Sequence, residues 1–193
     1  MPPRLGSPWR SPFAWQLATY FGVQSCIFYL PLGWLPTIEQ GLGVSARAAG
    51  VHLGTFLIVG IAANVVVPPF VNVGGDQRMT TTLVPGIVLV AILGLWIWPS
   101  AALVWVGLAG FGAGASMVVA LSLIPLRSAV GVDSGPLSSM VQNVGYAGVT
   151  IGLLLVGWAK QATASSVVVV AVVLGLAVIQ ALMGLLVGRV RRG

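Results

Sequence analysis

Uncharged polar side chains within long apolar stretches are the residues of this chain whose types and spacing could do chemistry. Two sets recur every four residues, so each set shares one helix face: Gln16, Tyr20 and Gln24, and Gln142, Tyr146 and Thr150. Their amides and hydroxyls can hydrogen-bond a polar solute, or they can join neighbouring helices. Polar groups are costly against lipid, so both stripes should face a bundle interior or a watery cavity.

Groups suited to catalysis or metal binding are scarce. The chain has one histidine, His52, one cysteine, Cys26, and three acidic residues that all fall in predicted loops. A metal site needs three or four ligands, and Ser138 and Ser139 have no evident base nearby. The sequence therefore predicts no enzyme, no metal site and no cofactor, and a single cysteine excludes an internal disulfide.

The excess of basic residues does not indicate nucleic acid. Nine Lys and Arg against three Asp and Glu give a net charge of +6, but they stand singly and cluster only near Arg189. A nucleic-acid binder needs a continuous basic surface, so we expect no such partner. Arg127 is the charge closest to membrane depth. It can attract an anionic solute entering from inside, or it can serve as an orientation anchor.

The elements that position these residues follow from composition. Charged residues are 6% and hydrophobic residues 58% of the 193, and the mean hydropathy is +1.03, whereas about a quarter of a soluble domain is charged. A bilayer core of about 30 Å needs roughly 20 apolar residues per helix. We therefore predict an all-α membrane protein: a six-transmembrane-helix bundle over 13–188, a segment 1–12 before it and a basic tail 189–193 after it. The spans are expected at 13–35, 49–71, 80–98, 101–124, 137–158 and 166–187.

Prolines and charges set the expected ends and orientation of these spans. Trp34-Leu35-Pro36 is predicted to end the first span and Pro68-Pro69 the second, because proline lacks an amide donor. One set of segments, comprising both chain ends and loops two and four, holds Arg4, Arg10, Arg78, Arg127, Arg189, Arg191 and Arg192. The other set holds Arg47 and Lys160. This bias predicts that both termini are cytoplasmic.

Glycines four residues apart occur at three places. The pairs are Gly50 and Gly54, Gly110 and Gly114, and Gly184 and Gly188. Small residues at this spacing let helix backbones approach each other closely in lipid. We interpret them as packing positions of a bundle.

Several short segments, taken in chain order, are similar to one group of membrane proteins. They are Ser11-Pro-Phe-Ala-Trp15, Phe21-Gly-Val-Gln-Ser25, Tyr29-Leu-Pro-Leu-Gly-Trp-Leu-Pro36, Gly74-Gly-Asp-Gln-Arg78, Leu121-Ser-Leu-Ile-Pro-Leu-Arg127 and Leu137-Ser-Ser-Met-Val-Gln-Asn-Val-Gly-Tyr146. Together they cover nearly the whole chain. The chain resembles the cyanate-transporter-like branch of the major facilitator superfamily, and it matches the C-terminal six-helix half.

The resemblance implies twelve helices in two halves, with a solute bound between the halves near mid-membrane. The first, fourth and fifth spans correspond to cavity-lining helices. The implied substrate-binding residues are Tyr20, Gln24, Tyr29, Gln142 and Tyr146. The branch further implies a small anion such as cyanate, or a polar heterocycle, as solute. The implied partners are a lipid bilayer, that of the cell membrane, and a complementary N-terminal six-helix half or a second copy.

Three functional hypotheses remain open at this point. The favoured one is the C-terminal half of a secondary transporter that moves a small solute by rocking against its partner half. A second is a non-transporting assembly subunit of a membrane complex, or an inactive truncated fragment. A membrane enzyme is disfavoured because catalytic groups are scarce.

Overall fold

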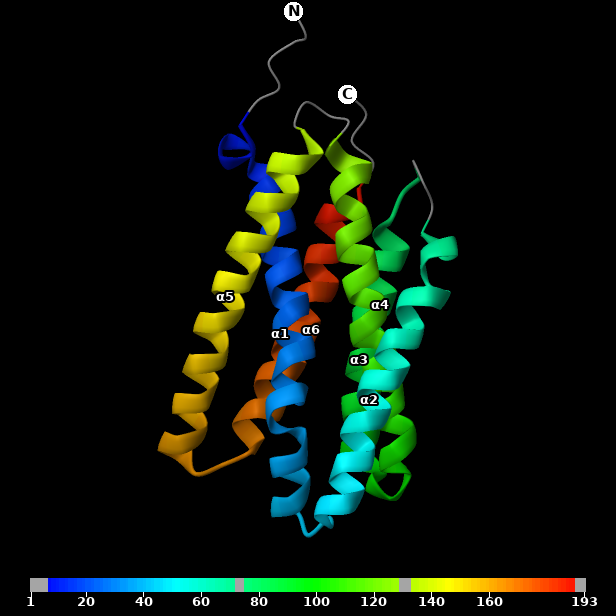
Figure 1. The fold of residues 1–193 in the computed structure, drawn as a ribbon, viewed down its shortest axis with the longest axis vertical. Coiled ribbons are helices and arrows are strands. Elements are labelled where there is room, and N and C mark those ends of the chain that lie inside the picture. Colours follow the sequence, from blue (N-terminus) through cyan, green and yellow to red (C-terminus); the bar gives the residue numbers. More distant parts are fainter. Residues whose placement is uncertain (1–6, 72–74, 129–132, 190–193) are drawn as a thin grey trace, which may run out of the picture.

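The computed structural model describes residues 7–71, 75–128 and 133–189, and those residues form helices and their connections without a strand. The long helices are α1 (Pro12–Gly41), α2 (Ala46–Val66), α3 (Arg78–Ile97), α4 (Ala102–Ser128), α5 (Ser134–Thr163) and α6 (Val167–Val187). One-turn 3-10 helices lie at η1 (Pro8–Arg10), η2 (Pro68–Phe70) and η3 (Pro99–Ala101). The long helices run side by side, and the start of α1 lies at the same end of the bundle as the end of α6 (Figure 1). We call this the terminal end and the opposite one the distal end.

The bundle has the composition of a membrane protein. Among the described residues, five stretches are long and apolar enough to cross a bilayer, and they contain α2 to α6. Helix α1 is not one of them, because polar residues such as Gln16, Gln24 and Ser25 interrupt its apolar sequence. It nevertheless packs against α4, α5 and α6. The all-α membrane bundle expected from composition is confirmed.

Four prolines of the described helices lie inside them rather than at their ends, and one of the four is Pro85 of α3. Helix α1 contains Pro31 and Pro36 and continues to Gly41, and α4 contains Pro125 and continues to Ser128. Helix α1 thus continues past the expected end of the first span at residue 35, and α4 continues past the expected end of the fourth at residue 124. Each proline removes one backbone hydrogen bond, but tertiary packing of the following turns outweighs this loss.

The other helix bounds lie close to the expected spans. Helices α2, α3 and α6 begin and end within five residues of 49–71, 80–98 and 166–187. Helix α5 is longer than expected, since it starts at Ser134 instead of 137 and ends at Thr163 instead of 158. The elongation of α1 has the larger consequence, because it brings Glu39 into a helix instead of a loop.

Glycines let α4 lie directly against α2. A Cβ atom added to Gly114 would lie 2.8 Å from both the Cα and the carbonyl carbon of Gly60, and one added to Gly110 would clash with the backbone of Phe56. No side chain larger than glycine fits at these two positions without separating the helices. The prediction that this pair serves packing is confirmed.

A second glycine pair joins α6 to α3 at the terminal end. An added Cβ at Gly188 would lie 2.6 Å from the Cα of Arg78, and one at Gly184 would meet the backbone of Thr81. The Thr81 hydroxyl also lies 2.8 Å from the Gly184 carbonyl oxygen. Around Gly50 and Gly54, by contrast, an added Cβ meets no atom within 4 Å. Among the described residues of this chain, that pair therefore packs against no other helix.

Tryptophans lie near both ends of the bundle. Trp9 and Trp15 pack edge to face at the terminal end, with ring centroids 5.9 Å apart. Near the distal end the helices carry Trp34, Trp96, Trp98, Trp105 and Trp158. The Trp105 indole donates a hydrogen bond of 3.1 Å to the Trp98 carbonyl oxygen. Indoles at both ends are typical of a protein anchored at two membrane–water interfaces.

Candidate functional site

Helix α5 has two unlike exposed flanks. Gln142, Tyr146 and Thr150, which we call the polar flank, recur every four residues on one side of the helix. Tyr146 is 37% exposed, Thr150 is exposed and Gln142 is half-buried. The other flank presents exposed Ile151 and Leu155, which suit contact with lipid. Because amides and hydroxyls are costly against lipid, the polar flank is the side of α5 suited to water, solute or another protein.

The hydrogen bonds of the polar flank leave one hydroxyl free. Gln142 Nε2 donates to Ser138 Oγ at 2.7 Å, and Thr150 Oγ1 donates to the Tyr146 carbonyl oxygen at 3.0 Å. Both bonds stay within α5. The Tyr146 hydroxyl makes no hydrogen bond to any other described residue. It is therefore able to donate to, or accept from, a group outside the bundle.

Aromatic rings connect the polar flank to α1 and α2. The Tyr146 ring packs edge to face on Phe21 of α1, with centroids 5.3 Å apart. Further along α1, Phe28 contacts Tyr29 at 5.4 Å and Phe56 of α2 at 5.6 Å. Tyr29 is half-buried. Three of the predicted site residues, Gln142, Tyr146 and Tyr29, are thus at least partly accessible.

The structure turns the other two predicted residues of α1 into the bundle. Gln24 is 1% exposed, and its Nε2 donates to the Ala113 carbonyl oxygen of α4 at 3.4 Å. Tyr20 is fully buried, and its hydroxyl donates to the Thr81 carbonyl oxygen of α3 at 3.2 Å. Both side chains hold α1 to its neighbours, and the structure does not bring Tyr20 to the polar flank of α5.

Arg127 lies in the last turn of α4, towards the terminal end. Its side chain is outside the part of the chain that the structure describes, so its role in attracting anions stays a prediction. In that described part, no cluster of three or more His, Cys, Asp and Glu is able to hold a metal ion.

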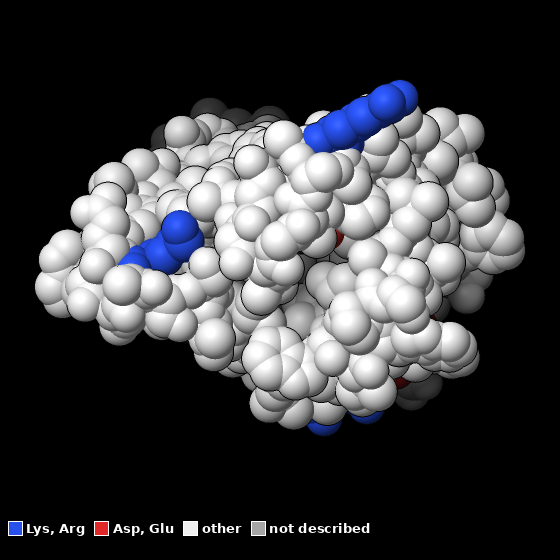
Figure 2. All heavy atoms as spheres, turned by 90° about the horizontal axis from the view of Figure 1, so that it is seen from below, with Lys and Arg blue, Asp and Glu red and all other residues white. Residues whose placement is uncertain are grey.

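A contact between buried Glu39 and half-buried His52 joins α1 to α2 near the distal end. His52 Nδ1 lies 2.7 Å from Glu39 Oε1, and the two side chains are 15% and 7% exposed. Glu39 Oε2 is buried and has no hydrogen-bond partner among the described residues. Figure 2, which looks onto the distal end, shows separate basic side chains and only traces of acidic surface. The sequence reading missed this pair because it ended the first helix before Glu39.

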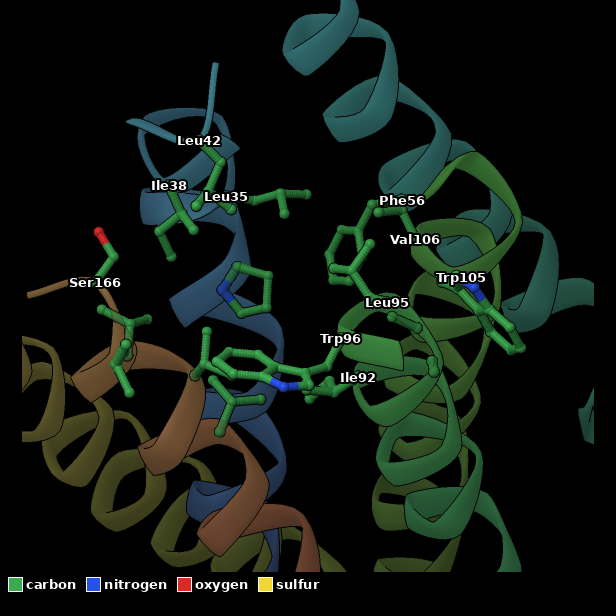
Figure 3. A pocket seen from close by; sticks show the side chains of 17 residues that line it. Leu35, Ile38, Leu42, Phe56, Ile92, Leu95, Trp96, Trp105, Val106 and Ser166 are labelled. Atoms are coloured by element: carbon green, nitrogen blue, oxygen red, sulfur yellow. The ribbon is translucent and has the colours of Figure 1, made fainter. Parts of the chain in front are cut away.

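An apolar cavity of about 260 Å³ lies beside this pair, between α1, α2, α3, α4 and α6. Figure 3 shows Leu35 and Ile38 of α1, with Leu42 just after it, facing Phe56 of α2 and Trp96 of α3 across the cavity. Ile38 directly precedes Glu39, so the last turns of α1 carry both the carboxylate and a wall of the cavity. The lining is almost wholly apolar and does not include the polar flank.

The sequence of this chain is similar to the sequences of proteins named as transporters and permeases. The chain is 35% identical over 181 residues to a 2-nitroimidazole transporter of Escherichia coli (strain K12), which is 94% of this chain and 46% of that protein. It is 36% identical over 119 residues to a putative anionic 4-hydroxy-benzoate permease of Thauera aromatica, covering 62% and 70% of the two chains. A cyanate transport protein of Escherichia coli is 27% identical over 137 residues, 70% of this chain and 35% of that protein. The chain thus spans less than half of the length of the two Escherichia coli relatives. No family model matches it.

Proposed function

Since the chain belongs to the cyanate- and nitroimidazole-transporter-like branch of the major facilitator superfamily, we propose that it forms one six-helix half, the C-terminal one, of a secondary transporter. The polar flank of α5 carries this proposal. An exposed tyrosine hydroxyl and a half-buried amide within a membrane span require a polar neighbour. A solute cavity closed by a complementary half, or by a second copy of the chain, supplies one.

The proposed solute is a small anion or a polar heterocycle. Tyr146 and Gln142 offer a hydroxyl and an amide, which donate to an anionic oxygen or to a ring nitrogen. The Tyr146 ring, which packs edge to face on Phe21, suits contact with a flat ring. In this proposal Gln24 and Tyr20 lie behind the proposed solute cavity, where their hydrogen bonds to α4 and α3 fix α1 in place. The relatives named for nitroimidazole, hydroxybenzoate and cyanate all handle solutes of this size.

We further propose that the terminal end faces the cytoplasm of a cell whose plasma membrane holds the protein. Among described residues, Arg10, Arg78 and Arg189 lie at the terminal end. Arg47 and Lys160 lie at the distal end. This distribution follows the general excess of Lys and Arg on the cytoplasmic side.

A chimaeric transporter tests the proposal. In the 2-nitroimidazole transporter of Escherichia coli, the segment that aligns with this chain is replaced by the chain itself. Uptake of labelled 2-nitroimidazole, 4-hydroxybenzoate and cyanate is then measured in proteoliposomes. We expect saturable transport of at least one of the three. In that chimaera Gln142→Ala and Tyr146→Phe each remove one neutral hydrogen bond, so the apparent affinity should fall roughly 2- to 10-fold.

Leu155→Ala on the apolar flank is the matched control, because it truncates an exposed α5 side chain on the lipid side. Its affinity should equal that of the parent chimaera. Affinities unchanged in both polar-flank variants would remove these residues from the site. A chimaera that inserts but moves none of the three solutes would favour the alternative of a non-transporting subunit or an inactive fragment.

A further inference from the structure

An elongated groove of about 450 Å³ runs along the bundle between α1, α5 and α6. Its lining residues extend from Ala18 to Leu30 on α1 and from Val144 to Val156 on α5. At 1.5 Å per residue each of these stretches is about 18 Å long, which is close to the roughly 15 Å of hydrocarbon in one leaflet of a bilayer. Because the helices of a membrane bundle cross the bilayer, the groove has the direction and the length of a lipid acyl chain.

Glycines give this groove its shape. A Cβ atom added to Gly22 of α1 would lie 3.2 Å from the Cα of Gly145, so α1 and α5 touch there. Helix α5 packs mainly against α1 and much less against α6, and α6 lies behind α1 in Figure 1, with α5 to the left of both. Gly148 lines the groove, and a Cβ added to it would meet no atom within 4 Å. The groove is therefore open where α5 has no side chain to fill it.

The walls of the groove suit hydrocarbon and not a polar solute. Among the described residues that line it, Thr19 carries the only hydroxyl, and that hydroxyl donates to the Trp15 carbonyl oxygen at 2.9 Å. Cys26 contributes a thiol, which is a weak hydrogen-bonding group. The other lining residues are glycines or have apolar side chains. An apolar cavity of about 150 Å³ is enough to hold benzene, and this groove is larger.

The groove opens on the side of α5 that suits contact with lipid. Leu155, which is 60% exposed on the apolar flank, lines it, whereas no residue of the polar flank does. On α6 the lining residues are Val172 and Leu176, which are half-buried. A partner half placed against the polar flank would leave the groove facing the membrane.

A cation and two indoles lie where the headgroup of such a lipid would be. Trp15 is one turn from Thr19 towards the terminal end, on the same face of α1. Trp9 and Trp15 are 56% and 44% exposed, and exposed indoles are typical of the headgroup level of a membrane. Arg10 follows Trp9 in η1, which packs against α1 and α5 (Figure 1). Arg10 is exposed and forms no ion pair with another described residue.

We propose that the groove binds one acyl chain of an anionic phospholipid from the leaflet at the terminal end, with the lipid phosphate next to Arg10. The guanidinium attracts the phosphate at the membrane surface, the indoles lie beside the glycerol backbone, and the chain fills the space over Gly148. This lipid site goes beyond solute transport and requires neither the solute nor a partner half.

Native mass spectrometry of the whole chain in mild detergent tests the proposal, with phosphatidylglycerol and phosphatidylcholine of identical acyl chains as probes. We expect one tightly retained lipid, and an affinity about 5-fold higher for phosphatidylglycerol, as one Arg at the surface provides. Arg10→Gln should abolish this preference, and Gly148→Leu should lose the retained lipid of either kind. Gly54→Leu is the matched control, because it adds the same side chain to α2, where an added Cβ also meets no atom within 4 Å and no groove residue lies.

Photolabelling locates the bound chain without any substitution. Phosphatidylglycerol with a diazirine in the middle of one acyl chain is irradiated with the parent chain in lipid nanodiscs, and the modified peptides are identified by mass spectrometry. Adducts should concentrate in 18–30 and 144–156. Adducts that are equally frequent on α2, or equal lipid retention by Gly148→Leu and Gly54→Leu, would overturn the proposal.

Two further outcomes of the mass spectra would also count against this lipid site. Equal retention of the two lipids by the parent chain would overturn the contact between the phosphate and Arg10. A dimer of the parent that Gly148→Leu dissociates, with lipid retention unchanged, would show that a second copy of the chain covers the groove instead of a lipid.

Discussion

Replacing Gly114 with alanine tests whether the close contact between α4 and α2 holds the bundle together. The added Cβ would lie 2.8 Å from two carbon atoms of Gly60, whereas carbon atoms touch at about 3.5–4.0 Å. The helices must therefore separate by about 0.7 Å or more, because the obstacle is backbone and not a flexible side chain. Overpacking costs about 1–3 kcal/mol, and this site belongs at the upper end. Better helix propensity returns roughly 1 kcal/mol, which leaves a net loss of about 2 kcal/mol.

Gly54→Ala in α2 is the matched control, since an added Cβ there meets no atom within 4 Å. It gains the helix propensity of alanine without a clash, so its stability should equal or exceed that of the parent by up to about 1 kcal/mol. Unfolding of both variants is measured by SDS titration in mixed micelles and followed by helical circular dichroism. A Gly114→Ala chain that unfolds at the same SDS fraction as Gly54→Ala would refute the reasoning.

Two further predictions concern the contact between α3 and α6 and the orientation of the bundle in the membrane. Thr81→Val keeps the shape of the side chain but removes the hydroxyl that lies 2.8 Å from the Gly184 carbonyl oxygen, so we expect a loss of about 1 kcal/mol in the same SDS titration. Thr163→Val removes a hydroxyl that bonds within its own exposed turn, so this control should lose less stability. Equal losses in the two variants would contradict a role of Thr81 in holding α6 to α3. Single cysteines placed at Arg78 and Arg189 in a Cys26→Ala chain should react with a membrane-impermeant maleimide only after cells are opened, while one at Lys160 should react in intact cells; the reverse pattern would invert the proposed orientation.

Composition and hydropathy were sufficient to predict the bundle, because they state which solvent the chain requires. Predictions of helix ends from single residues failed where contacts with other helices outweighed the local preference. Proline was expected to end the first span near Pro36, but α1 continues to Gly41, and the extra turns place Glu39 against His52. Had a helix through Pro36 been considered, a carboxylate near the end of one helix and a histidine in the next would have suggested the pair.

The spacing of residues predicted which side chains share one face of a helix, but it did not predict what that face contacts. Gly110 and Gly114 pack against another helix, whereas Gly50 and Gly54 have the same spacing and face open space. The polar stripes show the same limit. Tyr20 and Gln24 share a face that is buried in the bundle, whereas the stripe of α5 lies on an accessible flank. Periodicity within one helix contains no information on where its neighbours lie, so the candidate site required the assembled structure.

The tryptophan side chains at the two ends of the helix bundle restrict how the bundle can move in a membrane. Vertical displacement in the bilayer would carry one group of tryptophans into hydrocarbon and the other into water, and both transfers are unfavourable. Tilting about an axis in the membrane plane keeps both groups near their interfaces at modest cost. Movement of the bundle relative to a neighbouring half should therefore be rotation and not piston-like translation. Brominated lipids that quench tryptophan emission at a chosen depth would detect the difference between the two.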